Sequence, residues 1–135
     1  MEQLIHRFCI KYRVNKAECS VIHQCALFIG YLKRNGISST MTKGFCTCAG
    51  AACRHFWVDA DTQKIDIARE ISKFHTPELE YIPTVLQYEI ADDVKRIDLQ
   101  DPKIVEENER LFELWNENQA EFWKTSSPKI RNIRI

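Results

Sequence analysis

The sequence predicts an α+β fold in a single domain that spans residues 1–135. A chain of 135 residues suits one hydrophobic core and can bury roughly two-thirds of its unfolded surface without disulfides or metals. Apolar residues recur at helical spacing near both ends of the chain, and alternate around a polar turn between them. We expect residues 15–70 to form the core, and residues 76–135 to form an extended segment followed by helices.

Charge and hydropathy narrow the classes of partner. The chain has 19 basic and 19 acidic residues, so nothing in it indicates a nucleic-acid partner. No apolar run approaches the ~20 residues that cross a bilayer, and the N-terminal segment carries charges where a signal peptide would be apolar. The sequence therefore predicts a cytoplasmic protein with no membrane partner. In such an intracellular, reducing compartment the six cysteines are expected to serve as core residues, metal ligands or nucleophiles.

Two helices are expected in the first quarter of the chain. Residues 2–13 place apolar side chains at helical spacing. Asn15 and Glu18 have the spacing of a capping box, which predicts that a second helix begins near Lys16. Gly36 is suited to the left-handed position that ends such a helix. The apolar side of this helix is formed by Ile22, Cys25, Ala26, Ile29 and Leu32.

Strands are expected in the middle of the chain. Residues 37–48 are β-branched, aromatic and polar, as in a strand, and the small residues 48–53 indicate a turn or loop. Residues 55–59 and 64–68 alternate around the polar turn 60–63, which predicts a β-hairpin. Its apolar face would carry Phe56, Val58, Ile65 and Ile67.

Beyond residue 76 the pattern indicates an extended segment, and then a helix from Pro102 to about Asn118. The apolar side of that helix could contact a second copy of the chain, which predicts a possible homodimer. A short turn around Phe122 and a basic tail over residues 125–135 follow.

The hairpin brings two residues with catalytic potential together. If Asp59 pairs with Lys64, then His55 and Asp66 are diagonal neighbours on one face of the two strands. Diagonal positions lie ~7–8 Å apart, so a carboxylate can reach the imidazole and fix its tautomer. This pair would be the orienting half of a catalytic triad.

Cys19 could supply the nucleophile. In the first turn of its helix, unpaired N–H groups and the helix dipole would favour the thiolate. With His55 as the base and Asp66 orienting the imidazole, the chemistry would be attack on an acyl carbon through a thioester.

The segment AECSVIHQCALFIGYLKRNGISSTMTKGF, followed by CRHFWVDADTQKIDIA, resembles the core of the transglutaminase-like branch of the papain-like cysteine protease superfamily. In that branch a Cys opens a helix, a Gly-Ile pair leads to a strand with a glycine, and a His-x-Trp strand precedes a strand bearing an aspartate. The corresponding positions here are Cys19, Gly36, Ile37, Gly44, His55, Trp57 and Asp66.

The resemblance implies a papain-like core over residues 15–70, with a C-terminal helical extension. It also implies a hydrolase or transferase that acts on a peptide or protein substrate through Cys19, His55 and Asp66. The chain departs from the pattern in lacking a Gly or Trp before the Cys and in having cysteines before His55. The whole is also similar in character to small proteins of large DNA viruses, and a viral origin would allow a place in the virion as an alternative to the cytoplasm.

Two other functions fit the same residues. Cys46, Cys48, Cys53 and His55 offer three thiols and an imidazole within ten positions, which is the ligand set of a closed zinc site. Such a site would use His55 as a ligand, so it excludes the triad. The other alternative is a structural or protein-binding protein that keeps the core without the chemistry.

Single residues also have simpler interpretations. Cys19 could pack as part of a hydrophobic staple at the start of its helix, and Cys25 fits the core of the same helix. His23, one helical turn after Cys19, is an alternative base. Trp57 is expected in the core or in the wall of a cleft.

Overall fold

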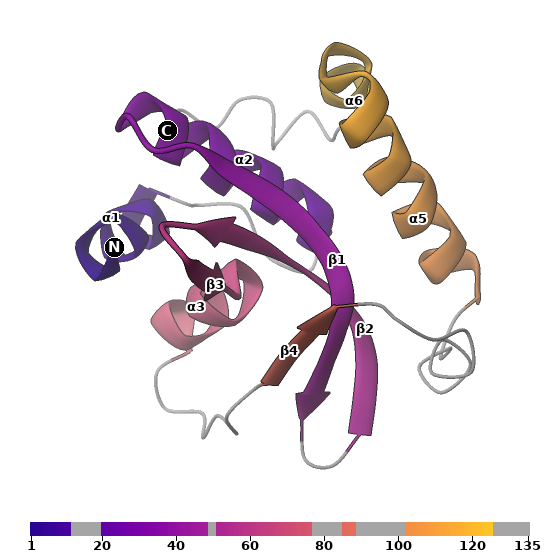
Figure 1. The fold of residues 1–135 in the computed structure, drawn as a ribbon, viewed down its shortest axis with the longest axis horizontal. Helices are drawn as coiled ribbons and strands as arrows, with labels where there is room; N and C mark the ends of the chain where they lie inside the picture. Colours follow the sequence, from indigo (N-terminus) through magenta and orange to yellow (C-terminus); the bar gives the residue numbers. More distant parts are fainter. Residues whose placement is uncertain (12–19, 49–50, 77–84, 89–101, 126–135) are drawn as a thin grey trace.

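The computed structural model describes residues 1–11, 20–48, 51–76, 85–88 and 102–125 (Figure 1). These residues form a mixed α+β structure, with five helices and one four-stranded antiparallel sheet. In chain order the elements are α1 (Glu2–Lys11), α2 (Val21–Arg34), β1 (Ser39–Cys48), β2 (Ala51–Ala60), β3 (Gln63–Ile65), α3 (Ile67–His75), β4 (Val85–Tyr88), α5 (Pro102–Glu117) and α6 (Gln119–Thr125).

One hydrophobic cluster joins the helices to the sheet. It contains buried side chains from all five described helices and from β1, β2 and β3. Phe28 of α2 and Phe56 of β2 are among its buried aromatic residues. The predicted apolar face of Phe56, Val58, Ile65 and Ile67 is buried in this cluster.

Helix α2 begins later than the sequence predicted. Ser20 has an extended backbone (φ −69°, ψ 157°), and its hydroxyl accepts a hydrogen bond from the His23 N–H. A serine with this geometry is an N-cap, so α2 begins at Val21 and the predicted start near Lys16 is wrong. The capping box of Asn15 and Glu18 lies outside the described residues. Gly36 has a φ of +78° after the end of α2, as predicted.

The sheet has the order β3-β2-β1-β4. β1 and β2 form a long hairpin in which Gly44 pairs with His55 and Cys46 with Cys53. Asp59 pairs with Lys64, as predicted, but Ala60 also pairs with Gln63. The turn is therefore only Asp61 and Thr62, and both have positive φ (49° and 62°), as the tight turns of twisted hairpins require. Similarly, strands replace most of the loop predicted over residues 48–53.

The predicted strand over residues 64–68 is wrong in its second half. β3 ends at Ile65, and Asp66 accepts a hydrogen bond from the Arg69 N–H as the N-cap of α3. Ile67 and Ile71 are one helical turn apart and both are buried, so they form the side of α3 that faces the core.

Helix α5 covers the core with its apolar side. Leu111 and Trp115 are buried, and the Phe112 ring lies 5.5 Å from that of Phe56 in β2. The dimer was expected because the apolar side of this helix would need a partner. The core of the same chain covers that side, so this argument no longer supports a dimer. The homodimer itself stays a prediction. No helix in the described ranges is long and apolar enough to span a bilayer.

Candidate functional site

His55 and Asp66 form a close pair. The Nε2 atom of His55 lies 2.8 Å from Oδ1 of Asp66. Their side chains are 17% and 13% exposed, so the pair is shielded from bulk water but still accessible. The proximity predicted from the hairpin register is confirmed, although Asp66 lies just after β3 and not within it.

The carboxylate of Asp66 is fixed by the backbone of α3. Its Oδ1 also accepts the Arg69 N–H at 3.2 Å, so the same oxygen caps the helix and contacts the imidazole. With the carboxylate ionised, Nε2 of His55 donates the hydrogen bond and Nδ1 is the basic nitrogen. Within the described part of the chain, Nδ1 of His55 makes no hydrogen bond. This is the tautomer that a general base requires, with its basic nitrogen available to a reacting group.

The cross-strand partner of His55 is Gly44, which has no side chain to compete for space on that face. Trp57, two residues further along β2, is fully buried, and the Lys64 ammonium lies 5.7 Å from its ring centroid. Near the hairpin turn, the Thr42 hydroxyl donates to a carboxylate oxygen of Asp59. The strand that bears the histidine is thus held by contacts on both sides of it.

Cys19 lies outside the described residues, so its distance from His55 stays untested. The start of α2 nevertheless changes its position relative to the helix. The sequence predicted that Cys19 lies in the first turn of the helix. Because Ser20 is the N-cap, Cys19 instead directly precedes the cap. Cys25 is fully buried in the middle of α2, as predicted for a core residue.

His23 is held by the same cap. Its Nδ1 lies 2.6 Å from the Ser20 hydroxyl, and burial lowers the pKa of its imidazole. Its ring lies 4.9 Å from the ring of Phe122 in α6. These contacts direct His23 towards an aromatic cluster, so they do not support its use as an alternative base.

The predicted zinc ligands share one hairpin. Cys46 is directly opposite Cys53, and His55 follows two residues later in β2. The side chains of Cys48 and Cys53 are not among those described, and the described side chains contain no group of three metal ligands. The zinc site therefore stays a prediction.

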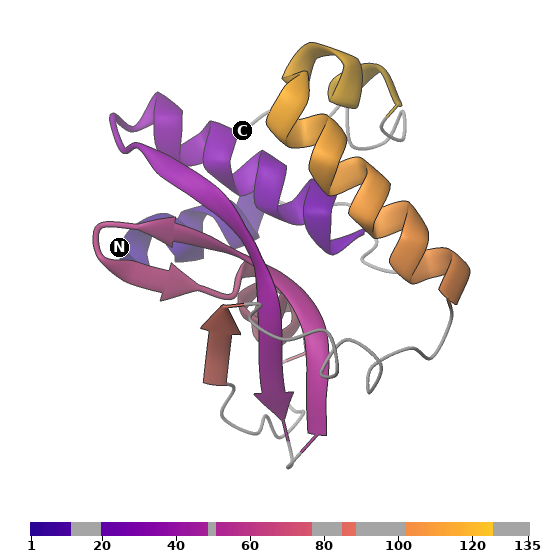
Figure 2. The ribbon, with the colours of Figure 1, turned by 45° about the vertical axis from the view of Figure 1, so that its right-hand side comes forward.

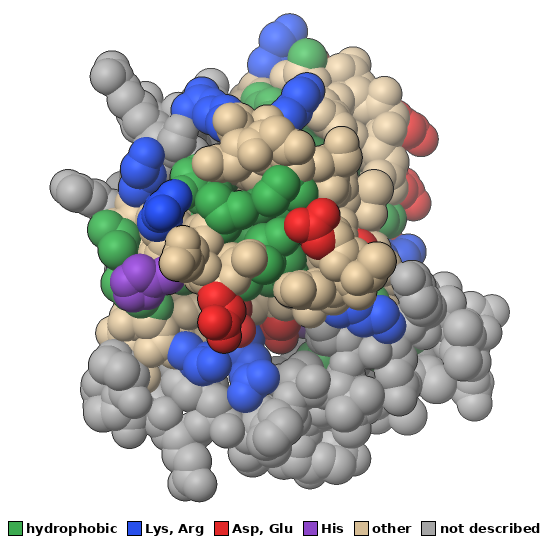
Figure 3. All heavy atoms as spheres, turned by 60° about the vertical axis from the view of Figure 1, so that its left-hand side comes forward, with side chains coloured by type: hydrophobic (Ala, Val, Ile, Leu, Met, Phe, Trp, Pro, Cys, Tyr) green, Lys and Arg blue, Asp and Glu red, His purple; other side chains and the backbone are tan. Residues whose placement is uncertain are grey.

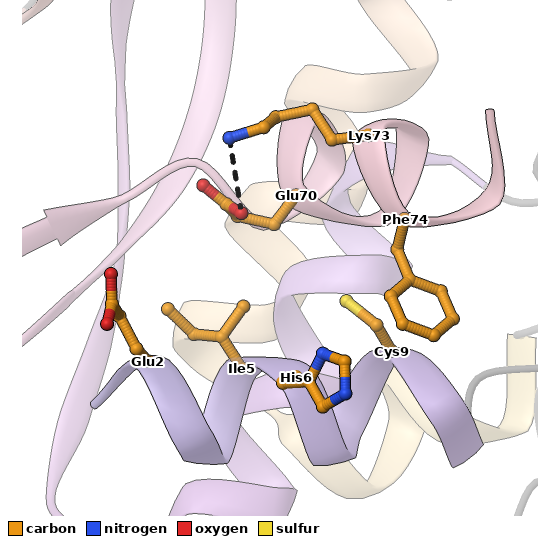
Figure 4. Close-up of a pocket in the computed structure, with 7 residues that line it drawn as sticks. All are labelled: Glu2, Ile5, His6, Cys9, Glu70, Lys73 and Phe74. Carbon is orange, nitrogen blue, oxygen red and sulfur yellow. Dashed lines mark ion pairs between the residues drawn. The ribbon is translucent and has the colours of Figure 1, made fainter. Parts of the chain in front are cut away.

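Two hollows lie away from His55 and Asp66. A groove of about 440 Å³ separates α1 from α3, with Ile5, Cys9 and Phe74 facing one another inside it (Figure 4). Burial, with a smaller contribution from the Glu70 charge, raises the pKa of Cys9 to about 11. On this side of the molecule, apolar side chains gather near the centre of the face, among charged groups and a histidine (Figure 3). The second hollow, of about 560 Å³, is lined mostly by hydroxyl-bearing and charged residues around the turn between β2 and β3.

The sequence did not predict the capping role of Asp66. The signal was present, because an aspartate followed by apolar residues one helical turn apart is a common helix start. The alternation of residues 64–68 concealed it.

Comparisons with known proteins gave no match: no family model fits the chain, and no curated protein or solved structure is significantly similar to it.

Proposed function

We propose that this chain is a cysteine-dependent hydrolase or acyltransferase that acts on amide bonds of a peptide or protein, with Cys19 as nucleophile, His55 as base and Asp66 as the orienting group. The pairing of His55 with Asp66 at 2.8 Å carries the proposal. An imidazole fixed by a carboxylate at one nitrogen and available at the other is the arrangement that activates a nucleophile.

The reaction has two steps. His55 takes the thiol proton of Cys19, the sulfur attacks the acyl carbon, and His55 gives the proton to the leaving amine, which leaves a thioester. Water or an acceptor amine then gives a proton to His55 and attacks the thioester, and the sulfur leaves as a thiolate that takes this proton back from His55. Asp66 stays ionised throughout and stabilises the imidazolium that forms in each step.

Burial excludes two of the other cysteines as the nucleophile, and position supports Cys19. Cys9 and Cys25 are 1% and 0% exposed, so neither is accessible to a substrate. Cys19 directly precedes the cap of α2, where the first N–H groups of the helix favour negative charge.

The order of elements supports a papain-like, transglutaminase-like core. α2 is followed by the β1–β2 hairpin with its His-x-Trp strand, and Asp66 comes directly after β3. This is the order that the resemblance implies, with the aspartate moved from a strand to the start of a helix.

Thiol alkylation tests the proposal. We expect iodoacetamide at pH 6 to modify Cys19 at least tenfold faster than a thiol in a denatured control, since a paired imidazole favours the thiolate. The rate should fall to the control value in His55→Ala, and partly in Asp66→Asn, which can still cap α3. His75→Ala, at the exposed end of α3, is the matched control. A Cys19 that reacts like the denatured thiol, or whose rate does not change in His55→Ala, would refute the enzyme and leave the structural or protein-binding role and the zinc site.

The position of Cys46 opposite Cys53 favours a second candidate function, a zinc site that includes His55. Metal analysis of purified protein separates the two. Stoichiometric zinc that is lost in both Cys46→Ser and Cys53→Ser would support the zinc site and exclude the triad, because His55 cannot serve both.

A further inference from the structure

His23 is a buried histidine that the proposed function does not use. It is 7% exposed in the first turn of α2, and its ring contacts Phe122 of α6. Phe122 is fully buried and also contacts the rings of Trp115 and Trp123, at 5.1 Å and 5.4 Å. Figure 2 shows α5 and α6 beside α2. His23 is therefore one side chain through which α2 contacts the aromatic cluster of α5 and α6.

The surroundings of His23 suit only a neutral ring. Nδ1 is satisfied by the Ser20 hydroxyl, whereas Nε2 is buried and has no hydrogen-bond partner among the residues that the structure describes. Protonation would place a full charge among aromatic rings with no acceptor at Nε2. The charge would also lie at the positive end of the helix dipole, in a first turn that contains no acidic residue.

Among the described residues, no charged group compensates for a proton on His23. On α2 the basic residues Lys33 and Arg34 are in the last turn, far from His23. On α6, Glu121 and Lys124 are exposed and lie 3.8 Å from each other. The charged side chains of α5 are all exposed except Glu109, which pairs with Lys43 and Arg54 of the β1–β2 hairpin.

We propose that His23 is an acid-sensitive latch, which holds α6 against α2 while the ring is neutral and releases α6 when the ring takes up a proton. Release would expose Phe122 and the faces of Trp115 and Trp123, so an apolar surface would appear on α5 and α6 in mild acid. The latch does not depend on the proposed catalytic chemistry, and uses none of its residues.

The direction of the pH effect follows from proton linkage. Burial lowers the pKa of His23 below its ordinary 6.5, so the docked state binds the proton less well than the released state. Docking of α6 against α2 is therefore fully favourable above about pH 6.5, the ordinary pKa that His23 has in the released state. It weakens as the pH falls below this value towards the lower pKa that His23 has in the docked state. One proton changes the equilibrium by at most about tenfold per pH unit.

Hydrogen exchange of backbone amides tests the latch. The Phe122 N–H, which donates to the Asn118 carbonyl at 3.0 Å, is a suitable reporter for α6. Between pH 7.5 and 5.5, after correction for intrinsic exchange, we expect its protection to fall several-fold or more while the amides of α2 and β2 keep theirs. In His23→Gln, which stays uncharged, the change should disappear. His75→Gln, an exposed histidine, should behave as wild type.

Several results would overturn the latch. These are protection of α6 that does not change with pH, a pH effect of equal size in His23→Gln, or loss of protection in all elements together. If His23→Gln does not fold, NMR titration of the wild-type ring decides. A His23 ring pKa at or above 6.5 would refute the proposal, and a lower value with parallel shifts of the Trp115 and Trp123 indole signals would support it.

Discussion

Glu109 joins helix α5 to the sheet, and removing its charge should loosen the whole C-terminal helical part. The carboxylate accepts a hydrogen bond from Lys43 at 2.9 Å and a second one from Arg54. Both cations lie on the β1–β2 hairpin that also carries His55. Glu109→Gln removes the charge and keeps the size of the side chain, so it tests the electrostatic contribution alone.

The expected loss follows from the exposure of the three side chains. A hydrogen bond to a charged group contributes about 1.5–3 kcal/mol when shielded, and the Arg54 side chain is only 8% exposed. Lys43 and Glu109 are 24% and 26% exposed, which reduces their pair to about 1 kcal/mol or less. Because glutamine can still accept one hydrogen bond, we expect Glu109→Gln to lower the free energy of unfolding by about 2–3 kcal/mol.

Urea denaturation followed by circular dichroism measures this loss. With a denaturant dependence of about 1–3 kcal/mol per molar, the urea midpoint should fall by roughly 0.7–3 M. Glu107→Gln is the matched control, because Glu107 pairs with Arg110 on the same helix and both side chains are more than half exposed, at 53% and 56%. It should cost no more than about 0.5 kcal/mol. Equal midpoints for the two variants would refute the argument that burial makes the Glu109 contacts strong.

Four further predictions concern the backbone and one thiol. Gly36 has a φ of +78°, so Gly36→Ala should destabilise the protein by about 1 kcal/mol in thermal unfolding. Gly30→Ala should instead stabilise the protein by about 0.5–1 kcal/mol, because Gly30 is inside α2 and a Cβ there meets nothing within 4 Å. If Gly36→Ala stabilised the protein or Gly30→Ala destabilised it, the backbone conformation assigned to that glycine would be contradicted. Thr62→Gly should stabilise the β2–β3 turn by up to about 1 kcal/mol, since Thr62 has a φ of 62°. A lower free energy of unfolding in urea would instead show that the Thr62 side chain makes a stabilising contact. Cys9, with its pKa raised to about 11, should resist alkylation at pH 8 in the native protein and should react in urea. Mass spectrometry measures the labelling, and rapid labelling of Cys9 in the native protein would mean that α1 opens readily.

Local patterns allowed much of the central hairpin to be predicted. The alternation on both sides of the turn fixed which residues pair, because a shift by one position would have turned Phe56 and Val58 towards solvent. That register is what brings His55 within reach of Asp66. Gly36 could be predicted for the same kind of reason, since few other residues tolerate its backbone conformation.

Other features depend on competition between local signals, which a pattern does not resolve. Asn15 with Glu18 and Ser20 both have the chemistry of a helix cap, and in the folded chain Ser20 caps α2. At Asp66 the alternation of a strand competes with a helix start, and in the folded chain Asp66 caps a helix. The apolar side of α5 was recognisable, but only tertiary structure shows that Phe56 and the core cover it.

The shared oxygen of Asp66 makes the geometry of the histidine a property of the main chain. A carboxylate without a backbone contact could adopt several rotamers, and an imidazole hydrogen-bonded to it would then be equally mobile. Here the first turn of α3 immobilises the acceptor, so the ordering entropy of the pair is lost during folding and not during a catalytic cycle. Substitutions that destabilise the first turn of α3, even far from any substrate, would consequently make the orientation of the His55 Nδ1 atom less well defined.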